Sequence, residues 1–233
     1  YTLDMTDEEL LRLRDVWEQQ YAPYEGKIKA RQTRNKTNYL GFEQRGGMET
    51  DIPVASNLLF EAEETFIPQA LAKSPEPVVW SDNTEEGKKK SSDIKTMLQY
   101  HADTLVLSRV LGVAMRHWSV YFLGIIKHGW DKKGKDITLS VRNPRNFIFD
   151  INGYINVKGS DEGTSLGERI ESSAKELIEL FPKSKTYITT KVEGKLGTKV
   201  VRTEWWTDEY SFTTFEDEVL DKHKNEFFNY EKE

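Results

Sequence analysis

The amino-acid sequence predicts an α+β fold in which N-terminal helices, including one long buried helical stretch, are followed by mostly antiparallel strands with a short helix among them. The first observation is that apolar residues up to about Phe122 recur at the helical period of about 3.6 residues. The second is that the period changes to about two after Gly124, where short apolar runs alternate with turn-forming residues. The length of 233 residues and the 31% charged content fit a globular protein.

The composition limits the classes of function. A formal net charge of -6, with a pI near 5.5, argues against a protein that wraps nucleic acid with its whole surface, because such binding needs a strongly basic face. The chain has no cysteine, which excludes disulfides, thiolate nucleophiles and cysteine-based zinc sites. No apolar run approaches the ~18 residues of a membrane span, and no signal-peptide pattern is present. We therefore expect a soluble protein that does not contact membranes and is made in the cytoplasm.

Two further features suggest that other chains or segments complete the protein. The apolar content of 37% is below the ~45–50% that is usual when glycine is counted. We therefore expect part of the chain to be buried against other chains. The sequence begins at Tyr1 and ends in the charged run Asn-Tyr-Glu-Lys-Glu, so we also expect a piece of a longer protein.

Residues 1–50 are predicted to form one helix followed by an extended basic arm. Thr6 and Glu9 have the spacing of a helix capping box. Apolar residues follow on one helical face: Leu10, Leu13, Val16, Trp17 and Tyr21. Residues 26–50 are polar and glycine-rich without a clear period, which predicts an irregular crossing segment. Its basic side chains are Lys27, Lys29, Arg31, Arg34 and Lys36. A solvated surface explains such a cluster more often than a phosphate-binding site does.

Residues 51–123 are predicted to be a helical part. Asp51 is suited to cap a helix, Pro53 to its first turn and Pro68 to a kink, so we expect a bent, largely buried helix that ends before Pro75. A short strand is expected at residues 78–80. The long helical stretch 92–122 has too many apolar positions for one narrow stripe, which predicts burial on several sides or a break into two helices.

Residues 124–233 are predicted to be the β-rich part of the same domain. Residues 125–144 fit two strands around a Lys-Lys-Gly-Lys turn, and residues 147–157 fit another pair around Asn152-Gly153. Ser173 and Glu176 form the capping box of a short helix that Pro182 ends. Residues 186–215 fit a hairpin that continues into a third strand.

Catalytic and metal-binding motifs are weak. Residues 163–167 match G-x-S-x-G, but the nucleophile elbow needs a preceding strand and a following helix, whereas polar segments flank Ser165 here. The segment that starts at Asp150 lacks the glycine position of a calcium loop. The four histidines show no zinc-binding spacing, and no phosphate-binding glycine motif is present. We therefore expect no catalytic residue, no metal and no cofactor, with a hydrolase using Ser165 as a remote alternative.

Two pairs of residues are candidates for contacts with a neighbouring subunit. Trp205 and Trp206 are adjacent in a predicted strand, so one ring enters the core while the other faces a second layer or subunit. Arg142 and Arg145 flank an Asn-Pro bend, where they either pair with acids of a neighbouring subunit or lie on the surface beside a turn.

A run of three lysines is the candidate for contact with phosphate. It consists of Lys88, Lys89 and Lys90, in or just before the long helical stretch. Lysines in such a position can meet the phosphates of DNA without reading its sequence. An exposed charge run is nevertheless more often only solvated.

The order of five segments resembles the N-terminal half of tailed-bacteriophage portal proteins. These segments are a helix with a proline-rich exit (57–79), a helix that leads into a Lys-His-Gly-Trp-Asp strand (115–131), the bend between strands (137–150), an acid-rich helix ending in Phe-Pro (166–182) and the strand VVRTEWWTDEY (200–210). The resemblance covers roughly residues 55–215 and lies in the co-linear order of the segments.

The resemblance implies a wing-like domain and a structural function without catalysis. Portal proteins form a ring, typically of twelve subunits, at one capsid vertex of the virion. They contact the major capsid protein, the terminase and a head–tail adaptor, and double-stranded DNA passes through the ring without sequence readout. The stem, clip and crown of such a subunit have no visible counterpart here. Alternatives from other classes are a monomeric protein-binding adaptor and the hydrolase noted above.

Overall fold

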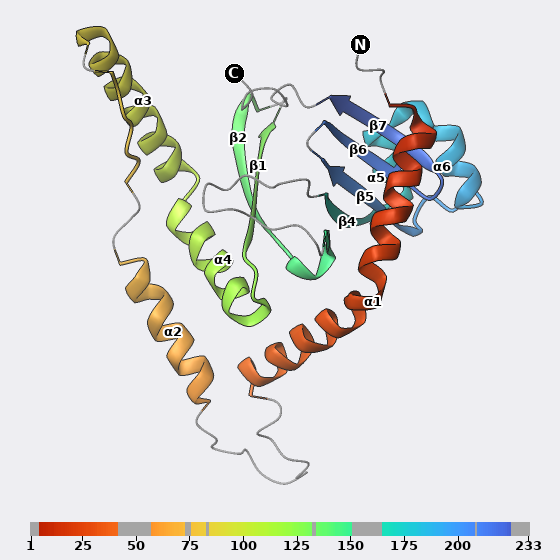
Figure 1. Cartoon of the computed structure of the whole chain (residues 1–233), viewed down its shortest axis with the longest axis horizontal. Coiled ribbons are helices and arrows are strands. Elements are labelled where there is room, and N and C mark those ends of the chain that lie inside the picture. Colours follow the sequence, from red (N-terminus) through yellow and green to blue (C-terminus); the bar gives the residue numbers. More distant parts are fainter. Residues whose placement is uncertain are drawn as a thin grey trace. The chain divides into compact units, whose positions relative to one another are not determined.

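The computed structural model describes residues 5–41, 57–72, 76–82, 84–131, 134–150, 165–207 and 209–224. The fold is α+β, as predicted, with helices first and antiparallel strands after them (Figure 1). The chain divides into two compact units. Unit 1 consists of residues 1–28 and 146–233, and unit 2 consists of residues 29–145. These boundaries differ from the expected ones near residues 50 and 123.

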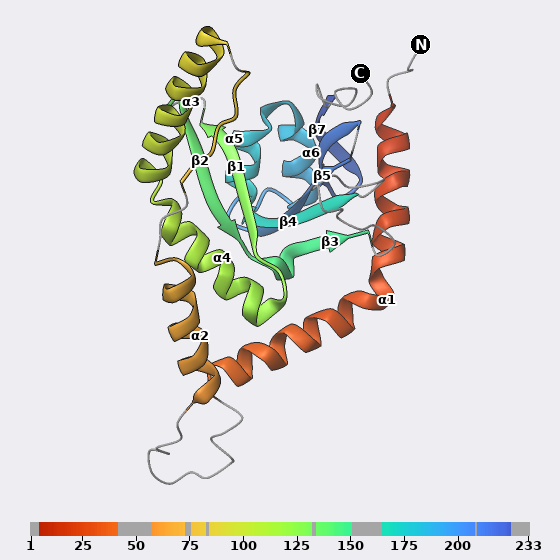
Figure 2. The same cartoon turned by 60° about the vertical axis from the view of Figure 1, so that its left-hand side comes forward.

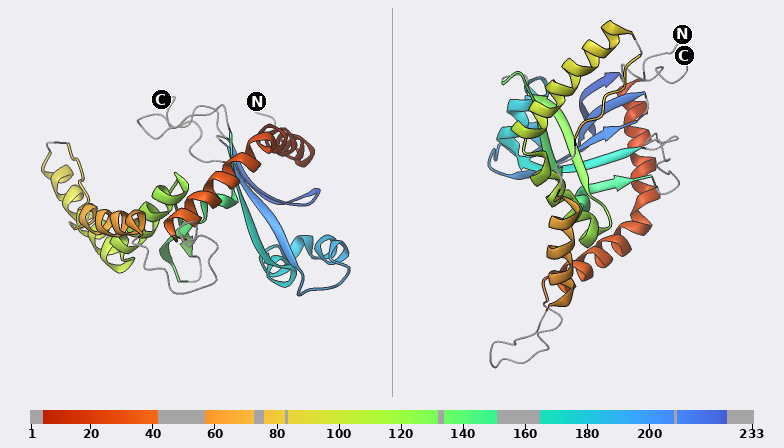
Figure 3. Two further views of the ribbon diagram at one scale, coloured as in Figure 1. Left: turned by 90° about the horizontal axis from the view of Figure 1, so that it is seen from below. Right: turned by 90° about the vertical axis from the view of Figure 1, so that its left-hand side faces the viewer.

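Unit 1 contains a five-stranded antiparallel sheet with the order β3-β4-β5-β6-β7. Its strands are β3 (Phe147–Phe149), β4 (Leu166–Ser173), β5 (Lys199–Trp206), β6 (Tyr210–Phe215) and β7 (Glu218–Lys224). Two short helices, α5 (Ala174–Leu180) and α6 (Lys185–Lys191), lie between β4 and β5, and they appear beside the strands in Figure 3. The prediction of a strand at residues 186–191 is wrong, because Ile188 is fully buried on the inner face of α6.

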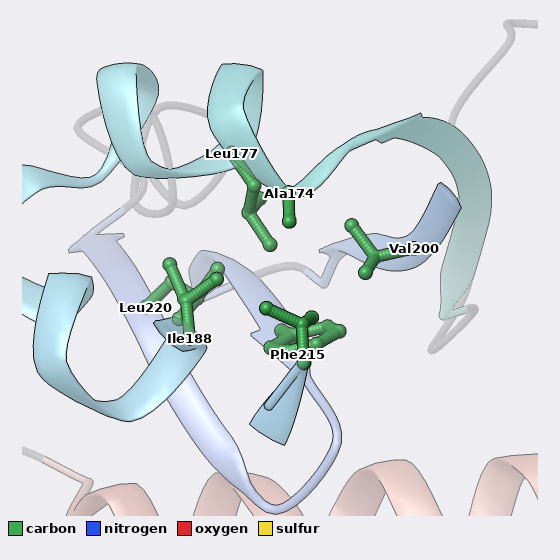
Figure 4. Packing of buried hydrophobic residues seen from close by; sticks show 7 residues of the cluster. Ala174, Leu177, Ile188, Val200, Phe215 and Leu220 are labelled. Carbon is green, nitrogen blue, oxygen red and sulfur yellow. The ribbon is translucent and has the colours of Figure 1, made fainter. Parts of the chain in front are cut away.

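Two hydrophobic clusters cover the faces of this sheet. Helices α5 and α6 contribute Leu177 and Ile188 to the first cluster, where they meet Val200 and Phe215 of the sheet (Figure 4). The second cluster lies on the other face of the sheet, where the first part of α1 (Asp7–Tyr39) packs against the strands. Its buried members are Leu10, Tyr21, Ile148, Trp205, Tyr210 and Phe212. Residues of opposite parity on β5 and β6 belong to different clusters, as the alternation of side chains along a strand requires.

Helix α1 is longer than the sequence indicates. The capping box is present at its start, where the Glu9 carboxylate accepts from the Thr6 amide at 2.7 Å. The helix then continues through Pro23 and Gly26 to Tyr39, so the predicted irregular arm is wrong over residues 26–39. Residues 26–39 are rich in lysine, arginine, glutamine and alanine, which have high helix propensity. Their combined preference offsets the cost of Gly26 in the helix, which is about 1 kcal/mol. Residues 42–50 of the arm lie outside the described residues.

The described residues of unit 2 contain the last part of α1, three further helices and a two-stranded hairpin (Figure 2). The helices are α2 (Leu58–Ala70), α3 (Glu85–Thr104) and α4 (Leu107–Tyr121), and the antiparallel strands are β1 (Ile125–Asp131) and β2 (Asp136–Arg142). The hairpin confirms the predicted change of period after Gly124. A Cβ on Gly124 would lie 2.3 Å from the Ala114 carbonyl oxygen, so this close approach between α4 and β1 requires glycine.

Two expectations for unit 2 need correction. The segment 78–80 forms no strand with the described residues. Helix α2 is not largely buried, since Ile67 is its one buried residue, and Asn57 caps it. The long helical stretch is broken between Thr104 and Leu107, which confirms the predicted alternative of two helices. Asp51, Pro53, Pro75 and the Asn152-Gly153 turn lie outside the described residues.

Candidate functional site

The apolar surface of unit 2 is the most unusual feature of the molecule. Of the seventeen buried hydrophobic residues in the described chain, only Ile67, Ala114 and Val120 belong to unit 2. Fifteen of the twenty exposed large hydrophobic residues belong to it. We call these fifteen the unit 2 apolar surface: Leu40, Leu58, Leu59, Phe60, Phe66, Val78, Trp80, Ile94, Met97, Leu98, Tyr100, Val106, Trp118, Phe122 and Trp130. Unit 2 thus has a small core and much uncovered apolar area.

Helix α3 carries a regular part of this surface. Ile94, Met97 and Leu98 follow the i, i+3, i+4 spacing of one helical face, and each is exposed by 41% or more. None of the residues of α3, all of which are described, is buried. An amphipathic helix gains most of its stability from burying its apolar face. The face of α3 is therefore suited to packing against another surface.

A polar cluster fastens three helices of unit 2 to one another. Arg116 of α4 donates from Nε and Nη2 to the two carboxylate oxygens of Glu64 of α2, at 2.7 and 2.8 Å. The Tyr39 hydroxyl, at the end of α1, donates to Glu64 Oε1 at 2.6 Å. Two parallel hydrogen bonds fix both the distance and the orientation of an arginine–carboxylate pair. The sequence had no signal for this cluster, because its members are far apart and have no motif spacing.

The electrostatics of this cluster oppose proton transfer near neutral pH. Hydrogen bonds from Arg116, and then from Tyr39, lower the pKa of Glu64. Burial, and then the hydrogen bond to Glu64, raises the pKa of Tyr39 to about 12. The hydrogen bonds to Glu64 also raise the pKa of Arg116. At neutral pH the carboxylate and guanidinium are therefore charged and the phenol is neutral, which fits a structural clamp rather than an acid–base pair.

A small cavity lies next to this clamp. Its volume is about 200 Å³, and it is lined by Asn35, Asn38, Tyr39, Leu59, Glu63, Ser119 and Val120. The Asn35 amide donates to the Val120 carbonyl oxygen at 3.1 Å, so one polar group of its wall is already satisfied. The volume is below the ~300 Å³ at which small-molecule sites begin. We assign no ligand to it.

The Asn-Pro segment forms a bend stabilised within its own chain. Asn143 Oδ1 accepts from the Arg145 amide at 3.1 Å, and the buried Pro144 opens a turn of 3-10 helix that leads into β3. The Arg145 guanidinium donates to Thr33 Oγ1 at 3.0 Å. Arg142 ends β2, and His117 Nδ1 lies 3.3 Å from its carbonyl oxygen. Arg142 and Arg145 are both half-buried. The hydrogen bond to Thr33 of α1 already uses one donor group of the Arg145 guanidinium.

The two adjacent tryptophans have different environments. Trp205 is completely buried, its Nε1 donates to Thr214 Oγ1 at 3.2 Å, and its ring stacks on Phe212. The ring centroid of Trp17 lies 5.4 Å from that of Trp205. Trp206 points to the other face of β5 and is half-buried. Of this pair, Trp205 is the core residue, and only Trp206 has area left for a partner.

The lysine run lies in the first turns of α3. Lys88 pairs with Glu85 at 3.1 Å. Lys90 pairs with Glu86 at 2.7 Å. Lys89 lies between them in the same helix, and all three lysines are exposed. Exposed pairs of this kind contribute little stability and reduce the local positive charge. The surroundings of Lys88, Lys89 and Lys90 therefore match a solvated helix face, the commoner explanation of such a run, more closely than the candidate phosphate contact.

Ser165 does not have the geometry of a nucleophile elbow. It is buried, and it directly precedes strand β4 instead of joining a strand to a helix. Among the residues that the structure describes, no group of three or more histidine and acidic residues is arranged to hold a metal ion. No helix in the same residues is long and apolar enough to cross a membrane.

Comparison with known proteins leaves the chain without an assigned family. No protein-family model matches it, and no curated protein is significantly similar to it in sequence.

Proposed function

We propose that this chain is the wing-containing part of a portal subunit of a tailed bacteriophage or prophage. In this proposal, copies of the protein form a ring, typically of twelve, at one capsid vertex of the virion. The ring contacts the major capsid protein and docks the terminase during packaging and a head–tail adaptor afterwards. Double-stranded DNA passes through it in packaging and ejection without sequence readout. The function is structural, with no catalytic residue.

The observation that carries the proposal is the unit 2 apolar surface. Its four most exposed aromatic residues are Trp80, Tyr100, Trp130 and Phe122, at 90, 65, 61 and 59%. With ~200 Å² for each aromatic side chain, these four alone expose on the order of 500 Å². A stable interface needs ~800 Å² on each partner. With the eleven other residues included, the exposed apolar area summed over the unit 2 apolar surface reaches that size.

The order of the elements supports the choice of a portal over other assemblies. In the segments whose order resembles portal proteins, α4 leads into β1, and the chain bends between β2 and β3. Strand β4 then leads into α5, which ends just before Pro182, and β5 carries the paired tryptophans. The proline-rich exit after α2 departs from the pattern, because the segment 78–80 is not paired as a strand. The remaining order agrees with the motifs on which the resemblance rests.

The decisive measurement is the mass of the assembled protein, by native mass spectrometry and light scattering at a salt concentration that suppresses nonspecific association. We expect a species near twelve chains. Replacing Ile94 and Leu98 by serine on α3 should shift the distribution toward monomer. The matched control replaces Leu180 and Leu196 by serine, which are similarly exposed but belong to unit 1. We expect this control to assemble normally.

Two outcomes would count against the proposal. A strict monomer at every concentration would favour the monomeric adaptor. A closed oligomer that is equally weakened by both pairs of substitutions would show that unit 2 is not the specific contact.

A further inference from the structure

The junction between α3 and α4 contains a residue in a disfavoured backbone conformation. Val106 has φ 49° and ψ 52°, in the left-handed region. This region is uncommon for any residue with a Cβ, and a β-branched residue there is an outlier. Val106 is 55% exposed, so close packing of its side chain does not hold it there. Figure 2 shows α4 running in a different direction from α3.

The local sequence gives no reason for a break. Residues 102–110 contain no glycine, proline or asparagine, and their apolar pattern continues that of α3 into α4. Val106 also makes no side-chain capping bond at the start of α4. In a continuous helix, the amides of residues 106–108 would bond to the carbonyls of residues 102–104. The bent form therefore has both an unfavourable dihedral pair and a poorly capped helix start.

Few contacts hold α3 in its present orientation. None of its residues is buried, and its apolar face, Ile94, Met97 and Leu98, is exposed. Near its end, His101 Nδ1 lies 3.9 Å from Asp136 Oδ1 of β2, which is too long for a hydrogen bond. A small change in free energy is therefore enough to move α3 relative to α4.

We propose that the α3–α4 junction is a two-state joint. It is bent at Val106 in the isolated chain, and it becomes one continuous helix over residues 85–121 when a second copy of the chain buries the apolar face of α3. This inference rests on the self-association proposed above. A second copy is the occupant we assign, because the apolar area exposed by unit 2 is of the size that an interface between copies would cover. Straightening also releases the dihedral strain, so it adds to the free energy of association.

Two substitutions at Val106 test the joint in opposite directions. Val106→Gly relaxes the left-handed conformation and weakens a continuous helix, whereas Val106→Ala keeps the left-handed penalty and favours the helix. The side chain is exposed, so both variants are expected to fold, and circular dichroism checks this. We expect the ratio of continuous to bent form to be about 5–30-fold higher in the alanine variant than in the glycine variant.

The readout is a distance between spin labels measured by pulsed electron paramagnetic resonance. Because the chain has no cysteine, Lys90→Cys and Ser119→Cys provide the only two attachment sites, and neither residue belongs to the unit 2 apolar surface. In a continuous helix their Cα atoms would be about 44 Å apart, at ~1.5 Å per residue, and the bent form is shorter. The same label pair is used in every variant, and self-association of the unlabelled variants is measured by light scattering.

The expected result is a shift toward the long distance in Val106→Ala and on assembly, with Val106→Gly assembling about 5–30-fold more weakly than Val106→Ala. Identical short distances in both variants, in a chain that self-associates, would overturn the joint and leave the proposed ring intact. A distance shift in Val106→Ala without any self-association would overturn the coupling together with the proposed ring.

Discussion

Gly167 lies opposite Trp205 in the β4–β5 ladder, and the indole occupies the space that a side chain would need. A Cβ at residue 167 would lie 2.7 Å from Trp205 Cζ3. Because the tryptophan is fully buried and hydrogen-bonded to Thr214, it has little freedom to move away. We predict that Gly167→Ala lowers the free energy of unfolding by about 1–3 kcal/mol in chemical denaturation, as overpacking does.

The control for this prediction is Gly197→Ala, because a Cβ there meets no atom within 4 Å. Its effect should stay within about 0.5 kcal/mol. In the double variant Gly167→Ala with Trp205→Phe, the smaller ring should recover part of the loss, so that the two effects are not additive. Strict additivity would mean that the contact between these two positions is not the cause.

The Tyr39–Glu64–Arg116 clamp predicts a pH dependence at the alkaline end. The pKa of Tyr39 in the folded chain, about 12, is above the ordinary value of 10.0. A pKa raised by folding contributes stability that is complete below pH ~10 and is lost as the pH rises toward about 12. We predict that Tyr39→Phe is destabilising at neutral pH by about 0.5–1.5 kcal/mol, the net contribution of one hydrogen bond. The difference from the unmodified chain should shrink between pH 10 and 12.

Denaturation curves at several pH values measure this difference. The same comparison in a Glu64→Gln background removes the charged acceptor, so the effect of Tyr39→Phe should be smaller there and depend less on pH. A difference that stays constant from pH 8 to pH 12 would show that the tyrosine hydroxyl does not sense Glu64.

At the scale of elements, two serines at helix N-termini form a matched pair. Ser173 caps α5 with a full capping box, in which its Oγ accepts from the Glu176 amide at 3.2 Å and the Glu176 carboxylate accepts from the Ser173 amide at 2.9 Å. Ser184 precedes α6 without any side-chain capping bond. We predict that Ser173→Ala lowers the free energy of unfolding by about 1 kcal/mol, while Ser184→Ala has little effect. Equal effects on the thermal or urea transition would refute the role of the cap.

How well the sequence predicted each element depended on whether the deciding interaction is local. Both capping boxes and the β1–β2 hairpin were predicted correctly, because the residues that form them are close in sequence. The strand expected at residues 186–191 is wrong because tertiary burial of Ile188 selects a helix there. The break at Val106 and the clamp on Glu64 could not be located, since neither depends on a local motif. For the paired tryptophans, the alternation was predictable, but which ring enters the core was not.

At the scale of the whole molecule, the two units differ in where their stability comes from. Unit 1 has two buried clusters around a sheet, whereas the described part of unit 2 contributes only Ile67, Ala114 and Val120 to the hydrophobic core. Hydrophobic burial is the main favourable contribution to folding. We therefore expect the stability of unit 2 to depend more on association than that of unit 1, since a partner that binds only the folded state stabilises it by mass action.

Hydrogen exchange at two protein concentrations tests this difference. In dilute solution, amides of α3 should exchange rapidly, because an exposed helix without buried residues opens locally at low free energy. At concentrations where light scattering detects assembly, we predict that the same amides exchange at least about tenfold more slowly. Amides of β4, β5 and β6, which lie between the two clusters of unit 1, should be strongly protected at both concentrations and serve as the internal control. Exchange in α3 that stays fast while the mass increases would place the contact between copies elsewhere than on α3.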